Sequence, residues 1–176
     1  MKKFQFLLLD AGPIIKLFEL GIWDEFINRC DVTVCRTVAE EAKWASRESE
    51  DIPINLESCE KDDRIRVVDT EVSVVQAFFS RFDLSYRAEL HDGEKETLAL
   101  LDTSPEPWRV CSADAAVFRI LGVLGKAEEG VSLEEVLKQI GLGRSLEWKY
   151  SERFRSKYTS LGQTDAIQGK GCADTS

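Results

Sequence analysis

The sequence has a single histidine, His91, and its five cysteines include no C-x-x-C pair. A zinc site built from thiolates and imidazoles is therefore not expected, and a serine or cysteine nucleophile would have only this histidine as its base. An odd number of cysteines in a chain of this length fits reduced thiols better than a disulfide framework. Also missing is the glycine signature of dinucleotide-binding and P-loop enzymes.

Basic residues are in deficit, with 23 Lys and Arg against 32 Asp and Glu and a net charge of −9. This balance argues against a protein that holds nucleic acid over a wide basic surface, although bound cations can reverse the sign of an acidic site. No apolar run approaches the ~20 residues that span a bilayer. The start of the chain resembles a signal peptide only faintly because its apolar run is too short and stops at Asp10, so we expect a cytoplasmic protein without a membrane segment.

One apolar run of strand length ends on a carboxylate, Asp10. Residues 6–9 do not alternate between apolar and polar, which is typical of a strand buried on both faces of a parallel sheet. Gly12 and Pro13 then turn the chain, and apolar residues at helical spacing follow. We expect Asp10 at the carboxyl edge of the sheet, where open α/β sheets bind ligands, although capping of the next helix would also explain it.

Three further strands are predicted near residues 31–35, 65–68 and 108–112, each followed by a helical pattern. Strands that alternate with helices indicate an α/β fold. We predict a three-layer α/β/α arrangement around a central parallel sheet of four to five strands. The stretch at 46–63, rich in Ser, Asp and Glu around a proline, is expected to be a loop.

The chain is expected to form one domain over residues 1–158. Its core would span residues 4–142, and its C-terminal helices would span 132–158. The polar, glycine-containing stretch at 159–176 is expected to be disordered.

Acidic residues recur where the predicted strands end or the following helices begin: Asp10, Glu40 or Glu41, one of Asp92, Glu94 and Glu96, and Asp114. Glu94 leads an apolar helical face, whereas Glu96 lies about 160° away from it. Each acid could simply favour a helix dipole. Four carboxylates at one sheet edge, however, cannot all stay ionised without counter-charge. An all-oxygen set suits Mg²⁺ or Mn²⁺, which could activate a water and stabilise charge on a phosphoryl group.

The order and spacing of these motifs resemble the PIN-domain family of metal-dependent ribonucleases, in the branch with D-A-x-P-L-I and G-E-x-E-A-x-x-L-A motifs. Here the motifs read Asp10-Ala11-Gly12-Pro13-Ile14-Ile15 and Gly93-Glu94-Lys95-Glu96-Thr97-Leu98-Ala99-Leu100. The second acid of the family, three residues after an aliphatic residue, corresponds to Glu41, with Glu40 beside it. The last acid follows a T/S-x-D pattern, here Ser112-Ala113-Asp114. The resemblance covers about residues 4–142 and departs from the family at Cys35, Thr97 and Ala115-Ala116.

The resemblance implies a Mg²⁺- or Mn²⁺-dependent endonuclease that hydrolyses single-stranded RNA with a metal-activated water, leaving a 3′-hydroxyl and a 5′-phosphate. The catalytic and metal-binding residues that it implies are Asp10, Glu41, Glu94 and Asp114. Hydrogen bonds to these ligands are expected from Thr37 and Ser112. Candidates for phosphate contacts are Arg36, Lys43, Lys95 and Arg119. Family members are often toxins of toxin–antitoxin pairs and commonly dimerise, so an antitoxin protein and a homodimer are expected partners.

Two alternatives remain at the level of the sequence. A catalytically weakened PIN-like module that acts in protein or RNA binding would fit the net charge of −9 and the departure at Ala115-Ala116. A phosphatase with an aspartyl nucleophile usually has a second Asp two residues after the first, and position 12 is Gly.

Overall fold

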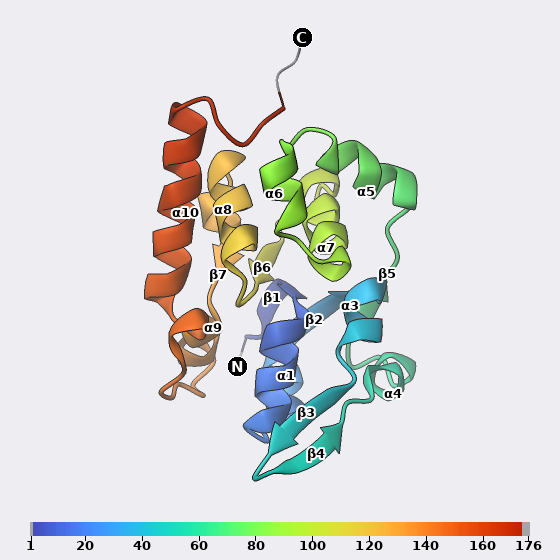
Figure 1. Ribbon diagram of the computed structural model, residues 1–176. Helices are drawn as coiled ribbons and strands as arrows, with labels where there is room; N and C mark the ends of the chain where they lie inside the picture. Colours follow the sequence, from blue (N-terminus) through green and yellow to red (C-terminus); the bar gives the residue numbers. More distant parts are fainter. Residues whose placement is uncertain (1, 174–176) are drawn as a thin grey trace.

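A parallel sheet of five strands in the order β5-β2-β1-β6-β7 forms the centre of the computed structural model, which describes residues 2–173 (Figure 1). The strands are β1 (Phe4–Leu9), β2 (Cys30–Cys35), β5 (Arg66–Val68), β6 (Arg109–Cys111) and β7 (Gly130–Val131). The predicted α/β fold and parallel sheet are therefore confirmed. β7 has only two residues, too few for an apolar pattern to reveal it.

Helices cover both faces of the sheet, which confirms the three-layer α/β/α arrangement (Figure 1). One face carries α1 (Ala11–Glu19), α2 (Trp23–Arg29), α4 (Leu56–Lys61) and α9 (Leu133–Gln139). The other carries α5 (Val72–Phe79), α6 (Leu84–Ala88), α7 (Asp92–Thr103), α8 (Ala115–Val123) and α10 (Glu152–Ile167). Short elements complete the chain: α3 (Arg36–Glu41), η1 (Ala127–Glu129) and η2 (Trp148–Tyr150).

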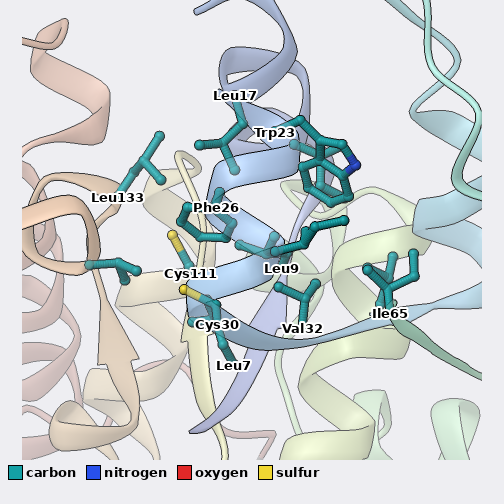
Figure 2. Packing of buried hydrophobic residues seen from close by; sticks show 14 of the residues in the cluster. Leu7, Leu9, Leu17, Trp23, Phe26, Cys30, Val32, Ile65, Cys111 and Leu133 are labelled. Carbon is teal, nitrogen blue, oxygen red and sulfur yellow. The ribbon is translucent and has the colours of Figure 1, made fainter. Parts of the chain in front are cut away.

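The central strand β1 shows why its apolar run does not alternate. Leu7 and Leu9 belong to the core on the α1 face, and Leu8 belongs to the core on the α7 face. All three side chains are fully buried. Figure 2 shows Leu9, Phe26 and Cys111 among the residues of the first core. A strand covered on both sides needs apolar residues in succession.

The topology of the sheet places the ends of β1 and β6 beside each other. After β1 the chain adds β2 and β5 on one side of it, and then returns to add β6 and β7 on the other. The backbone N–H of Asp10 donates to the carbonyl of Cys111 (3.0 Å), which extends the pairing of the two strands. Open α/β sheets bind ligands at such a switch point, outside the carboxyl ends of the strands.

The prediction of a loop over residues 46–63 is wrong. β3 (Trp44–Arg47) and β4 (Glu50–Pro53) form an antiparallel hairpin, and α4 follows it. Glu48 and Ser49 form the turn with φ values of 52° and 66°, as tight hairpins require. The composition was misleading because β3 buries only Ala45 and exposes its other side chains.

The prediction of disorder over residues 159–176 is also wrong for the described part of that stretch, because α10 continues to Ile167. The predicted domain boundary at residue 158 therefore falls inside α10. This helix packs along α8 through glycine. A Cβ at Gly162 would lie 1.9 Å from the carbonyl oxygen of Arg119. The chain then turns back, and the N–H of Ala173 donates to the carbonyl of Arg81 (2.9 Å). Residues 174–176 lie outside the described residues.

Within residues 2–173 no helix combines the length and the apolar character that crossing a bilayer requires. The longest, α10, has 16 residues.

Candidate metal centre

Asp10 is the buried centre of the candidate site, with only 5% of its surface exposed. Its Oδ1 accepts the N–H of Ala11 (2.8 Å), and its Oδ2 accepts the hydroxyl of Ser112 (2.7 Å). Burial raises the pKa of Asp10 to about 6, against the effect of these two hydrogen bonds and with added repulsion from Asp114 and Glu41. The carboxylate is thus firmly oriented, but its charge has little compensation.

Ser112 joins the first and last acids of the sheet edge. Its fully buried hydroxyl donates to Asp10 and accepts the N–H of Asp114 (3.0 Å). The Oδ1 of Asp114 in turn accepts the N–H of Ala116 (2.7 Å), so this acid also caps α8. One small hydroxyl therefore fixes the carboxyl ends of β1 and β6 relative to each other.

Glu94 reaches the same point from α7 and is 7% exposed. Its Oε2 accepts the N–H of His91 (2.9 Å). Burial and the neighbouring charge of Asp10 raise the pKa of Glu94 to about 8, and Asp114 adds to this rise. The crowding of carboxyl groups therefore disfavours the charged form of Glu94 when no cation is bound.

Glu41, and not Glu40, is the acid of α3 that joins this group. Its Oε1 accepts the N–H of Gly93 (3.2 Å), and its charge acts on Asp10. Gly93 permits the approach because a Cβ there would lie 2.8 Å from the Oε2 of Glu41 and 2.9 Å from the Cγ2 of Val38. Glu40 is exposed and lines a groove on the other side of α3.

The two other acids of the motif around Glu94, Asp92 and Glu96, do not join Asp10, Glu41, Glu94 and Asp114. Asp92 is exposed, and one of its oxygens lies 3.8 Å from the Nζ of Lys95. Glu96 is buried and accepts the N–H groups of Thr37 (3.0 Å) and Thr70 (2.9 Å). The sequence does not reveal this role of Glu96, because its partners come from distant segments that only the fold brings together. Thr37 accordingly contributes its backbone here, to Glu96.

We use the name carboxylate cluster for Asp10, Glu41, Glu94 and Asp114. Across residues 2–173, no lysine, arginine or histidine forms an ion pair with any member. Of the four phosphate-contact candidates, Arg119 is engaged with Asp165 (Nε to Oδ2, 2.7 Å). The negative charge of the cluster is therefore not balanced by side chains of the described chain.

The chemistry of this donor set fits a hard divalent cation, since all eight side-chain oxygens belong to carboxyl groups. Each carboxyl group accepts at least one hydrogen bond, from Ala11 and Ser112, Gly93, His91 or Ala116. In their present positions, however, no three His, Cys, Asp or Glu side chains of the described residues already form a metal-ion cage. Joint binding of one ion would require side chains of the cluster to move toward it.

Comparison with models of protein families, with curated proteins and with solved structures finds no match to this chain. The chemistry of the carboxylate cluster must therefore be inferred from its own residues.

Proposed function

We propose that the protein is a Mg²⁺- or Mn²⁺-dependent endoribonuclease of the PIN type that hydrolyses phosphodiester bonds of single-stranded RNA. The observation that carries the proposal is the carboxylate cluster at the switch point of the sheet. Two of its members, Asp10 and Glu94, are buried with raised pKa values, and no cationic side chain of the described residues balances them. Keeping such a costly arrangement is typical of functional sites.

The four acids would hold the cation, and the surrounding hydrogen bonds would keep them oriented toward it. A bound Mg²⁺ or Mn²⁺ would supply a nucleophilic water at neutral pH and would stabilise negative charge on the phosphoryl group. Ser112 would position Asp10 and Asp114 together, and Gly93 would hold Glu41 against α7. The resemblance to PIN ribonucleases further supports RNA as substrate, and from the same resemblance we propose a role as the toxin of a toxin–antitoxin pair.

The test is cleavage of a panel of single-stranded RNAs of mixed sequence by the purified protein with Mg²⁺, with Mn²⁺ and with a chelator. We expect cleavage that needs the cation, leaves a 3′-hydroxyl and a 5′-phosphate, and disappears in Asp10→Asn. Asp92→Asn is the matched control, because the Asp92 side chain is 85% exposed and lies outside the cluster. Cleavage that persists with the chelator or in Asp10→Asn would overturn the proposal. Tight cation binding without any cleavage would favour a binding module instead.

A further inference from the structure

A groove of about 550 Å³ lies on the other side of α3 from the carboxylate cluster. Its walls come from α3, the β3–β4 hairpin and α4, and its lining includes Arg36, Lys43, Trp44, Ile54, Asn55 and Lys61. A volume of this size is typical of ligand-binding clefts. Since α3 contributes Glu40 to this groove and Glu41 to the cluster, the two sites share one short helix.

Trp44 is the aromatic side chain of the groove, and 63% of it is exposed, whereas Trp23 and Trp108 are buried. The backbone around it is held in place. Trp44 pairs with Pro53 across the hairpin, and the carbonyl of Lys43 accepts the N–H of Ile54 (2.8 Å). An exposed indole on a hydrogen-bonded hairpin is the kind of platform on which unpaired bases stack.

The groove is less acidic than the chain as a whole, because three basic and three acidic side chains line it, whereas the chain has a net charge of −9. Two hydrogen bonds from Arg36 (3.0 and 3.1 Å) neutralise Glu60, and Lys61 pairs with Glu57 (3.0 Å). Lys43 has no ion-pair partner in the part of the chain that the structure describes. Lys43 and Glu40 are thus the two charged lining residues outside these pairs, and the ammonium group of Lys43 is the one available to contact a phosphate.

The groove is also close to the cluster along the chain. Glu41 and Trp44 are three residues apart, so their Cα atoms are separated by at most roughly 11 Å. The N–H of Lys43 donates to the carbonyl of Glu41 (3.0 Å), which fixes the turn between them. A strand whose phosphate lies at the cluster could thus reach Trp44 within a few nucleotides.

We propose that this groove binds the unpaired RNA strand beside the scissile phosphate, with one base stacked on Trp44 and a phosphate contacted by Lys43. The inference rests on the proposed ribonuclease function, which supplies the identity of the strand. Stacking accepts every base but needs a base that is not already stacked in a duplex, so the groove favours single strands.

The test is fluorescence anisotropy with a labelled single-stranded RNA of about 12 nucleotides and mixed sequence, a length that covers a binding groove of this kind. Asp10→Asn protein serves as the parent, so that the RNA stays intact, and Mg²⁺ is present. We expect Trp44→Ala in this parent to weaken binding roughly five-fold or more, and Trp44→Phe to retain most of the affinity. Lys43→Ala should reduce the slope of log K against log salt concentration by about 0.7.

Trp148→Ala is the matched control, because Trp148 is 50% exposed and does not line the groove. It should leave the affinity unchanged, as should Trp44→Ala for a duplex RNA of the same sequence. Equal affinity of Trp44→Ala and its parent, an equal loss in Trp148→Ala, or no RNA binding by the parent would each refute RNA binding in the groove.

The two proposals can fail separately. RNA binding that depends on Trp44 without cleavage by the wild type would support RNA binding in the groove and refute the ribonuclease activity. RNA cleavage that Trp44→Ala leaves unchanged would support the ribonuclease activity and refute the role of the groove.

Discussion

Glu94 and Glu96 are two residues apart on α7, yet their carboxylates meet opposite kinds of partner. Glu96 accepts backbone N–H groups from Thr37 and Thr70, which follow β2 and β5, and so fastens α7 to the sheet edge. Glu94 lies beside the carboxyl groups of Asp10 and Asp114. A negative charge therefore stabilises the fold at position 96 and destabilises it at position 94 when no cation is bound.

This contrast predicts different effects for two matched substitutions. Glu96→Gln should lower the free energy of unfolding by about 2 kcal/mol, because the amide has one oxygen for two N–H donors and presents its own N–H to the second. Glu94→Gln should change it by no more than about 0.5 kcal/mol at pH 7, because the raised pKa of Glu94, about 8, keeps this side chain largely protonated there and the amide mimics the protonated acid. Urea unfolding with a chelator measures both. An equal loss in the two variants would contradict the assignment.

The pH dependence of stability should report the charge of Asp10. Burial raises its pKa in the folded protein from 3.8 to about 6, so the native state holds this proton more tightly than the unfolded chain does. The resulting stabilisation is fully present below pH 4 and is lost as the pH rises through 6. With a chelator, this group should remove up to about 3 kcal/mol of wild-type stability between pH 4 and pH 7. Asp10→Asn should lack that loss, and parallel pH profiles of the two proteins would refute the prediction.

Gly93 should be needed for function rather than for folding. In an ordinary helix, replacing Gly by Ala adds about 1 kcal/mol of stability. A Cβ at Gly93 would instead press on Val38 and Glu41 and displace the carboxylate. Gly93→Ala is expected to weaken Mn²⁺ binding about ten-fold, which calorimetric titration can measure. Gly143→Ala is the control, because a Cβ there would lie at an ordinary 3.6 Å from the Cα of Lys138. Equal Mn²⁺ affinity of the two variants would show that Gly93 does not position Glu41.

The sequence predicts the sheet and the position of Asp10 because a buried parallel strand leaves a plain pattern: four apolar residues in succession and then an acid. It leaves Glu40 and Glu41 undecided because the two differ by about 100° around a helix whose start must be known. Thr37 fits an N-cap in the sequence, but the N-cap of α3 is Cys35, two residues earlier, and the helix begins at Arg36. The backbone N–H of Thr37 is then taken by Glu96, a partner that no local pattern reveals.

The second half of the C-terminal helix, from residue 159 on, escaped prediction for a different reason. Its contact with α8 is made by Gly122 and Gly162, and glycines in a polar segment suggest disorder rather than packing. Asp165 adds a partner for Arg119 from α8. Close backbone approach through small residues leaves no apolar pattern in the sequence.

This packing predicts that Gly162→Ala destabilises the protein strongly. Its Cβ would lie 1.9 Å from the carbonyl oxygen of Arg119, so α10 must move away from α8. We expect a loss of about 3 kcal/mol or more, at the upper end for overpacked sites. Thermal unfolding measures it, with Ser160→Ala at an exposed position of α10 as the control. Unchanged stability of Gly162→Ala would mean that α10 does not pack as described.

The proposed function depends on joint binding of a divalent cation by Asp10, Glu41, Glu94 and Asp114. Its most direct test is calorimetric titration of Mn²⁺ into the wild type, Asp10→Asn and Glu40→Gln at pH 8. Glu40→Gln removes an equal charge from the adjacent, exposed acid on the other side of α3. We predict that the wild type and Glu40→Gln bind Mn²⁺ alike and that Asp10→Asn binds it at least about ten-fold more weakly. No binding by the wild type, or equal binding by all three proteins, would mean that these four carboxylates do not form a cation site.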